Sequence, residues 1–208
     1  MRFPRTATII LTVVTAAFWL LIEALRATDA AVVMMGLIPG RLSGLIQMSG
    51  AVPAILTPLS STLVHGGFLH LLFNLIMLLW CGTAVERVLG RGPLLLLYVV
   101  GAYAAALAQW AVDPQSMTPI IGASGAISAV IGAFSLSFGQ QKRIVRSATL
   151  NRWINAIWLL IAWVVLQMLV GWGAAGQGVL VATPAHIGGF LAGMALQRPL
   201  LLWRYRKA

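Results

Sequence analysis

Negative charge is scarce in this sequence, and charge of either sign is rare. The 208 residues include only 4 acidic residues against 14 Lys and Arg, and charged residues make up 9% of the chain. A water-soluble domain carries about 25% charged residues, so this chain has too few to cover a soluble surface. Apolar residues make up 60% of the chain, and the mean hydropathy is +0.94. The composition therefore predicts a protein of the lipid bilayer, and long unbroken apolar runs without strand alternation predict that it is all-α.

Cysteine is also nearly absent, which excludes further kinds of site. The single Cys81 rules out a disulfide framework and a multi-cysteine metal site, and we expect it to be a small buried apolar residue. The chain has no HExxH motif and no acid beside a histidine, so neither a metal nor another cofactor is predicted. An aspartyl mechanism and a Ser-His-Asp triad both need a carboxylate inside an apolar run. None of the four acids, Glu23, Asp29, Glu86 and Asp113, lies in the middle of one.

Six apolar segments are long enough to cross a membrane, for which about 20 residues suffice. The segment 26–59 between the first two is too interrupted by Gly and Pro to span, so we interpret it as an interfacial loop. Short links elsewhere (83–92, 113–117 and 174–178) predict that neighbouring spans pack antiparallel. We therefore predict a single domain, residues 1–208, built as a six-transmembrane-helix bundle. The predicted spans are 7–25, 60–82, 93–112, 118–139, 153–173 and 179–201.

Positive charges gather on one side of this predicted bundle. Of the 14 Lys and Arg, twelve fall on the side of the two termini, and two, Arg26 and Arg41, fall on the other. This asymmetry predicts cytoplasmic termini. It also explains the net charge of +10 as a feature of topology, so no nucleic-acid partner is predicted. We expect the run 7–25 to be retained, because it is longer than the apolar part of a signal peptide and no small-x-small cleavage site follows it.

Small residues concentrate in the fourth and sixth predicted spans, on one helical face of each. Residues three or four apart share a face of a helix. Small faces let helix backbones approach closely in lipid, so we infer that these two spans touch along them. The stripes are Ser124, Ser128 and Gly132 on the fourth span, and His186, Gly189 and Gly193 on the sixth.

Polar side chains at membrane depth are costly and usually functional. All three histidines, His65, His70 and His186, lie in or at the edge of apolar spans, and Asn74 shares the helical face of His70. His65 lies five residues before His70, roughly 140° around a helix, so we expect it to face elsewhere. Counted from the predicted span ends, Ser124, His186 and His70 lie about 9, 10 and 15 Å below the outer surface. Three helices thus place a polar residue in one outer layer.

This layer holds the groups that hydrolysis by a serine nucleophile needs. A hydroxyl nucleophile requires a base, and His186 is the candidate for Ser124. A developing oxyanion requires donors, which His70, Asn74 and the backbone N–H of Ser124 could supply. Without an acid, the arrangement would be a Ser-His dyad in which packing orients the imidazole. Each residue alone also has a structural explanation, such as a Ser that bonds to its own helix, so the prediction rests on their combination.

Three motifs, in order along the chain, carry a family resemblance. The chain resembles the rhomboid proteases of the basic six-span bacterial type over about residues 57–195. Glu86-Arg87 followed by Leu89-Gly90 fits the same family. The motifs are His65-Gly-Gly-Phe-Leu-His70-Leu-Leu-Phe-Asn74, Gly122-Ala-Ser124-Gly125, and Ala185-His186-Ile-Gly-Gly189-Phe-Leu-Ala-Gly193.

The resemblance implies an intramembrane serine protease of a bacterial inner membrane, with single-span or other membrane proteins as substrates. It implies Ser124 as nucleophile, His186 as general base, and His70, Asn74 and the Ser124 amide as the oxyanion hole. His65 would organise hydrogen bonds of the neighbouring loop, and the fifth span would be the mobile side where a substrate enters. The supporting glycines would be Gly122, Gly125, Gly189 and Gly193.

The chain departs from the family pattern at two places. Many relatives have an aromatic residue four positions after the nucleophile, stacked on the base; here that position is Ser128, and Phe190 or Trp163 could replace the aromatic ring. The Trp-Arg pair of some relatives' first loop is missing, and only Arg41 lies there.

Two other functions compete with proteolysis. The first is that of a catalytically silent rhomboid-like protein that binds membrane helices; such proteins typically lack a Ser or His that this chain has. The second, a transporter or channel, predicts inverted repeats or broken midplane helices, which the sequence does not show.

Overall fold

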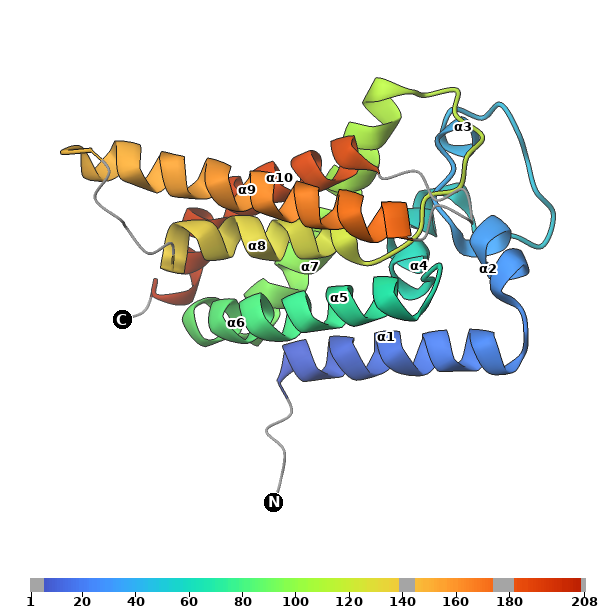
Figure 1. Cartoon of the computed structure of the whole chain (residues 1–208), viewed down its shortest axis with the longest axis horizontal. Helices are drawn as coiled ribbons and strands as arrows, with labels where there is room; N and C mark the ends of the chain where they lie inside the picture. The colour runs from blue at the N-terminus through green and yellow to red at the C-terminus, as the bar shows by residue number, and fades with distance from the viewer. Residues whose placement is uncertain (1–5, 139–144, 174–181, 207–208) are drawn as a thin grey trace, which may run out of the picture.

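Most of the long helices of the chain run side by side as a bundle, and the helix labelled α7 (Arg91–Val112) crosses behind them at a steep angle (Figure 1). The computed structural model describes residues 6–138, 145–173 and 182–206, with side chains described only to Leu169 in the second stretch. Within these residues every regular element is a helix, one isolated bridge joins Leu37 to Ile120, and turns and irregular segments connect the helices. The long helices are α1 (Ala7–Ala24), α5 (Phe68–Met77) continued by η3 (Leu78–Gly82) and α6 (Thr83–Leu89), α7 (Arg91–Val112), α8 (Ser124–Phe138), α9 (Ala148–Gly173) and α10 (Thr183–Arg204).

Short helices gather at one end of the bundle, beside the starts of α5 and α8 (Figure 1). They contact the extended segment before α8, where the backbones of Leu37 and Ile120 exchange two hydrogen bonds of 2.9 and 2.8 Å. The predicted loop 26–59 therefore consists in large part of short helices, and its position at the membrane surface stays a prediction. These elements are α2 (Thr28–Met35), α3 (Pro39–Leu42), η1 (Ala54–Leu56), α4 (Thr57–Ser60) and η2 (Ser61–Leu63).

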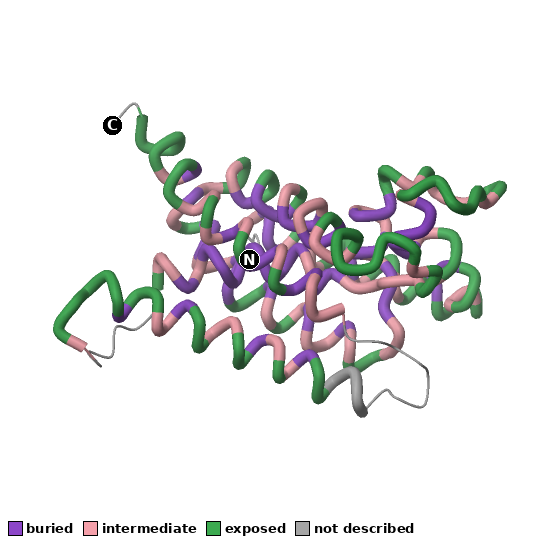
Figure 2. The backbone as a smooth tube through the Cα atoms, turned by 90° about the horizontal axis from the view of Figure 1, so that it is seen from above, coloured by how far each residue is buried: buried purple, intermediate pink, exposed green. Residues whose placement is uncertain are grey.

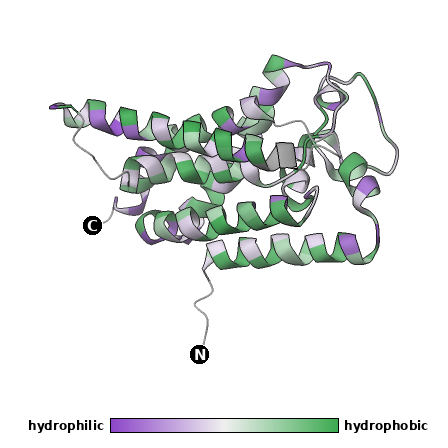
Figure 3. Cartoon of the chain, viewed as in Figure 1, coloured by the Kyte–Doolittle hydropathy of each residue, from purple (hydrophilic) through white to green (hydrophobic). Residues whose placement is uncertain are grey.

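Four helices among the described residues are long and apolar enough to cross a membrane: α1, the continuous helix Phe68–Leu89, α7, and Ala148–Leu169 of α9. Exposed residues alternate with buried ones along these helices (Figure 2), which are largely hydrophobic (Figure 3). The exposed apolar side chains include Trp80 and Trp158, which are 69% and 67% exposed. Continuous exposed apolar surface of this kind is suited to lipid. α8 has only 15 residues and α10 is not among the four, so the six-span count stays a prediction.

The second predicted span is correct in position but wrong at both ends. It begins at Phe68 rather than residue 60, because the chain leaves the helical conformation at 64–67. It then continues to Leu89, so the predicted loop 83–92 is wrong. Only Gly90 separates α6 from α7, with a φ of 89° that glycine adopts without strain.

The fourth predicted span also starts too early. α8 begins at Ser124 rather than residue 118, because residues 118–123 are not helical: the backbone of Ile120 pairs with that of Leu37, and the N–H of Gly122 donates to the carbonyl of Ser61. The first, third and fifth predicted spans agree with α1, α7 and α9 to within five residues at the ends that the structure describes. The predicted link 174–178 lies outside the described residues.

α8 packs against α10 so closely that their backbones touch. A side chain on Gly193 would collide with the carbonyl oxygen of Ala129, and one on Gly132 would collide with that of Phe190. Missing side chains thus permit the approach, as small residues do at helix contacts in lipid. The predicted contact between the fourth and sixth spans along their small-residue stripes is confirmed.

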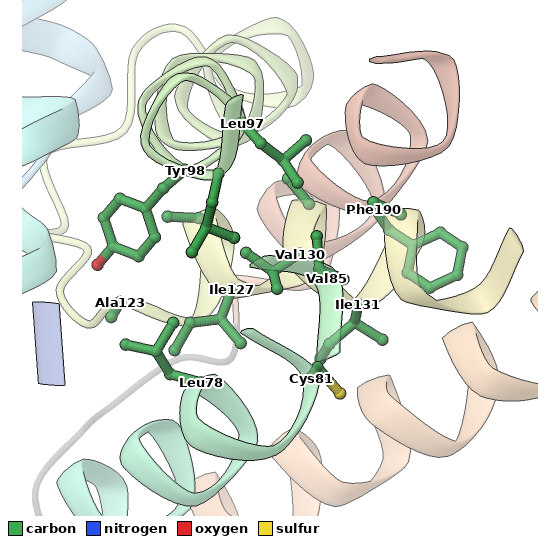
Figure 4. Close-up of a cluster of buried hydrophobic side chains, with 14 of the residues drawn as sticks. Leu78, Cys81, Val85, Leu97, Tyr98, Ala123, Ile127, Val130, Ile131 and Phe190 are labelled. Atoms are coloured by element: carbon green, nitrogen blue, oxygen red, sulfur yellow. The ribbon is translucent and has the colours of Figure 1, made fainter. Parts of the chain in front are cut away.

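Apolar side chains from η3, α6, α7, α8 and α10 fill the space around this contact (Figure 4). Ile127 and Val130 of α8 lie at its centre, fully buried. Cys81 is buried in the same cluster, as predicted, with 4% of its surface exposed. This core fixes the position of α8 relative to its neighbours.

A buried carboxylate joins α1 to the rest of the bundle. Glu86 of α6 accepts hydrogen bonds from the backbone N–H groups of Ala7 (2.8 Å) and Thr8 (2.9 Å) and from the Thr8 hydroxyl (2.6 Å). The first N–H groups of a helix have no acceptor within the helix, so Glu86 satisfies two of them. Arg204 of α10 donates to the carbonyl of Arg87 nearby (2.8 Å). The start of α1 and the end of α10 therefore lie at the same end of the bundle, opposite the short helices (Figure 1).

Candidate active site

Three helices begin at the end of the bundle where the short helices gather, and each brings one polar residue there. His70 is the third residue of α5, Ser124 the first of α8 and His186 the fourth of α10. All three line one cavity of about 950 Å³. Because α5 and α8 begin later than predicted, these residues lie in the first helical turn and not deeper along the helix. The three residues thus lie together at one end of the bundle, and their depth below the outer membrane surface stays a prediction.

Ser124 and His186 meet at hydrogen-bonding distance. The Oγ of Ser124 lies 2.8 Å from the Nε2 of His186, and the two residues are 6% and 3% exposed. The close packing of α8 on α10 produces this distance. A side chain at Gly189, one turn after His186, would collide with the carbonyl oxygen of Gly125. If the Ser124 hydroxyl donates, the imidazole proton lies on Nδ1, for which the described residues supply no acceptor.

The start of α8 presents backbone N–H groups beside this pair. The first N–H groups of a helix lack intrahelical acceptors, and Ser124 is the first residue of α8. Gly122 precedes it with a φ of 107°, and a Cβ at this position would lie 2.6 Å from the Nε2 of His70. Both the backbone conformation and the space beside the imidazole therefore call for glycine here.

His70 directs one ring nitrogen toward Gly122 and the cavity. Its other nitrogen, Nδ1, accepts a long hydrogen bond from the N–H of Gly66 (3.4 Å). We assign the proton to Nε2 on this basis, since hydrogen positions follow from hydrogen-bond partners. His70 thus offers a donor to a group in the cavity.

The prediction that His65 faces away from His70 is wrong. The two rings lie 5.0 Å apart between centroids, edge to face. His65 is outside α5, in the turn 64–67, so the angular spacing of a helix does not apply to it. Its Nε2 accepts a long hydrogen bond from the N–H of Ala123 (3.5 Å), which joins this turn to the residue before Ser124.

Asn74 lies one turn after His70 on α5, as expected, but it is not part of the cavity wall. It is fully buried, and its Nδ2 donates to the carbonyl of His70 (2.8 Å). Its Oδ1 has no hydrogen-bond partner among the described residues. The structure therefore brings Ser124, His186 and His70 together at the cavity, whereas Asn74 is buried away from the cavity wall.

α9 contributes two side chains that lie close to His186. Gln167 lines the cavity, and its Nε2 lies 3.5 Å from the Nε2 of His186. Sequence reasoning missed Gln167, although a lone amide in an apolar span was a usable signal of the kind that singled out the histidines. Trp163 contacts the His186 ring, with 6.3 Å between ring centroids. Phe190, the other suggested aromatic, lies in the apolar core (Figure 4).

The described part of the chain shows no set of side chains that could serve as ligands of a metal ion. No three His, Cys, Asp or Glu side chains of these residues are grouped to hold an ion. His65 and His70 lie next to each other, but each uses one ring nitrogen to accept a backbone N–H.

The helices and the cavity together define an integral, multi-pass helical membrane protein with a polar site at one end. Residues 53–203 match the model of the Rhomboid domain, and the chain belongs to the rhomboid family. The family resemblance of the three motifs is thereby confirmed. The chain is 34% identical over 139 residues to RHOMBOID-like protein 5 of Arabidopsis thaliana. It is 30% identical over 140 residues to Rhomboid protease GluP of Bacillus subtilis (strain 168) and 30% over 137 residues to Rhomboid protease GlpG of Pectobacterium atrosepticum.

These relatives are longer than the chain. The three matches cover 67%, 67% and 66% of this chain, but 42%, 24% and 45% of the respective relatives. The chain therefore spans less than half the length of each. The activity of GluP and GlpG as whole proteins is therefore only a basis for a proposal about this chain.

Proposed function

We propose that this protein is an intramembrane serine protease with a Ser124–His186 dyad. The observation that carries the proposal is the 2.8 Å approach of the Ser124 hydroxyl to the His186 imidazole inside a cavity. A nucleophile and a base within hydrogen-bonding reach are the minimum for acyl transfer by a serine enzyme. The names of GluP and GlpG as rhomboid proteases support the same reaction.

In the proposed reaction, Ser124 Oγ attacks the carbonyl carbon of a peptide bond while His186 Nε2 takes the hydroxyl proton. The tetrahedral oxyanion accepts hydrogen bonds from the Ser124 backbone N–H and from His70 Nε2. His186 then gives its proton to the leaving amine, and an acyl-enzyme on Ser124 remains. Water from the cavity hydrolyses this ester with His186 again as base.

Asn74 joins the oxyanion donors only if its amide turns toward the cavity, because it now bonds to the His70 carbonyl. In its present position it holds the first turn of α5, and so the His70 ring, in place. Gly122, Gly125, Gly189 and Gly193 support the site by close backbone approach, and His65 supports it through the residue before Ser124.

The proposed substrates are membrane proteins cut near the outer end of a spanning segment. A helix protects its carbonyl groups, so a substrate must unwind locally before Ser124 can attack. Helix-weakening residues near the cut would therefore favour cleavage. The proposal places the chain in a bacterial inner membrane as one six-span domain, with cytoplasmic termini and with the cavity on the outer side.

Replacing either member of the dyad tests the proposal. We expect Ser124→Ala and His186→Ala each to lower kcat by at least about 10⁴-fold, since members of such a unit are not individually dispensable. Cleavage of a purified single-span substrate in detergent or liposomes provides the measurement. Ser135→Ala is the matched control, because Ser135 is a buried serine of α8 whose hydroxyl bonds only to the Gly132 carbonyl among the described residues.

A fluorophosphonate separates the protease from a silent relative that binds membrane helices. The protease should be labelled at Ser124 and lose this labelling in His186→Ala, whereas a silent relative should bind helices without labelling. Near-normal turnover by Ser124→Ala would remove the assignment.

A further inference from the structure

In the described part of the chain, no group is hydrogen-bonded to the His186 imidazole on the side away from Ser124. Its Nδ1 is buried and has no partner among the described residues. The usual third member of a serine site, an acid on this nitrogen, holds the ring in a productive orientation. Packing against the ring must therefore do this work, and the structure shows which side chain lies there.

Trp163 of α9 lies edge to face against His186, with 6.3 Å between ring centroids and 68° between ring planes. Its exposed fraction is 2%, so the indole is held on all sides. Edge-to-face contact is a favoured geometry for two aromatic rings. Trp163 thus limits the rotation of the imidazole from the side of α9.

A chain of two hydrogen bonds fixes Trp163 relative to the nucleophile. The indole Nε1–H donates to Ser128 Oγ (2.7 Å), and the Ser128 hydroxyl donates to the backbone carbonyl of Ser124 (2.7 Å). Ser128 is fully buried one turn after Ser124. The side chain that packs on the base is therefore tied to the residue that carries the nucleophile.

We propose that Trp163 and Ser128 together are positioning residues that orient His186 toward Ser124. The inference rests on the proposed protease function. It assigns to Trp163 and Ser128 the orienting role that the acid has in a Ser-His-Asp triad. Because Trp163 belongs to α9, the alignment of the dyad depends on α9 remaining packed on α8. Gln167, one turn further along α9, faces the same imidazole and adds to this dependence.

The test compares variants that remove the ring or the hydrogen bond and leave both members of the dyad intact. Trp163→Leu removes the ring, Trp163→Phe keeps an aromatic ring without its N–H, and Ser128→Ala removes the acceptor. We expect Trp163→Leu to lower kcat by about 100-fold, the lower range of general-base catalysis, with KM within about twofold of wild type. Trp163→Phe and Ser128→Ala should each lower kcat by about tenfold, because the ring remains but is less firmly placed.

Two matched controls separate this effect from loss of a Trp or Ser in general. Trp158→Leu removes a 67% exposed indole of the same helix, and Ser135→Ala removes a buried serine of α8. Both should keep kcat within about twofold of wild type. The thermal unfolding midpoint and the fraction of protein that a fluorophosphonate finally labels show whether each variant is folded.

Moving the aromatic ring from α9 to α8 tests orientation directly. Position 128 faces α10, since the Cβ of Ser128 lies 3.2 Å from the place of a Cβ on Gly189. A ring there has space only when the indole is removed. We therefore expect Ser128→Phe/Trp163→Ala to recover at least about tenfold in kcat over Trp163→Ala, while Ser128→Phe alone remains impaired.

A kcat within about twofold of wild type in folded Trp163→Leu would overturn this inference. A fall in kcat that is fully explained by a smaller fraction of folded protein would overturn it as well. Should Trp163→Leu not fold, Trp163→Phe and Ser128→Ala decide in the same way. The proposed function fails separately, if Ser124→Ala retains cleavage. An inactive Ser124→Ala beside a fully active Trp163→Leu would overturn the positioning role alone.

Discussion

The histidines near Ser124 have different surroundings, although all three are buried or nearly so. His186 meets the serine hydroxyl, His70 points a donor nitrogen at Gly122, and His65 accepts from the backbone of Ala123. Only the first two line the cavity. The three histidines thus differ in which ring nitrogen accepts a hydrogen bond from a backbone N–H, and this difference decides which nitrogen can face the cavity.

His70 and Asn74 should differ in what their removal costs. His70→Ala deletes a donor aimed into the cavity, and we expect kcat to fall by about 100-fold with the folded fraction unchanged. Asn74→Ala deletes a buried hydrogen bond to the His70 carbonyl, so it should lower the free energy of unfolding by about 1 kcal/mol and kcat by at most about tenfold. Kinetics and unfolding of both purified variants provide the comparison. Equal losses in kcat with unchanged stability would mean that the Asn74 amide reaches the oxyanion in the substrate complex.

The sequence located Ser124, His186 and His70 because a polar residue in an apolar run stands out without any knowledge of the fold. It could not place His65 correctly, since the angular spacing of a helix applies only within one helix and α5 begins at Phe68, after His65. The Trp163–Ser128 hydrogen bond joins residues 35 positions apart and left no pattern in the chain. Trp163 was only one of two aromatic candidates until the packing of α9 distinguished it from Phe190.

At the scale of helices, the contact between α8 and α10 sets the distance within the dyad. Gly193→Ala places a methyl group against the Ala129 carbonyl, which must push the helices apart. We expect a loss of about 1–3 kcal/mol in stability, typical of overpacking, together with lower kcat as Ser124 and His186 separate. Unfolding in mixed detergent micelles and steady-state cleavage would be measured side by side.

Gly92→Ala is the matched control for this substitution. Gly92 lies in the first turn of α7 and has open space where a Cβ would lie. Its replacement should leave kcat unchanged and stability equal or higher by up to about 1 kcal/mol, because alanine restricts the unfolded chain. A Gly193→Ala protein that behaves like Gly92→Ala would show that the two backbones do not need this approach.

The ends of the helices were predicted less well than their existence, for two physical reasons. Hydropathy reports composition, and it does not distinguish residues 118–122 from a helix, although they are not helical and Ile120 pairs with Leu37. Conversely, residues 83–92 were predicted as a link between two apolar spans, yet 83–89 continue the helix, in which Glu86 accepts hydrogen bonds from the start of α1. Tertiary hydrogen bonds decided both boundaries.

For the molecule as a whole, the predicted orientation in the membrane follows from charge alone and can be measured. In a Cys81→Ala background, Gln115→Cys lies in an exposed segment near the short helices, and Ala148→Cys lies exposed at the start of α9. A membrane-impermeant maleimide should label Gln115→Cys in intact cells and Ala148→Cys only after permeabilisation. The reverse pattern would place the cavity on the cytoplasmic side.

Ser124 stands where α8 begins, and this position has an electrical consequence for the entire protein. The peptide dipoles of a helix sum to roughly half a positive charge at its first turn. No Lys or Arg of the described residues lines the cavity, and a cation buried there would carry a large desolvation cost. In the proposed reaction the fleeting anion on the substrate would instead meet the positive pole of α8. The chain could then stabilise negative charge within a bilayer although no Lys or Arg of the described residues lines the cavity.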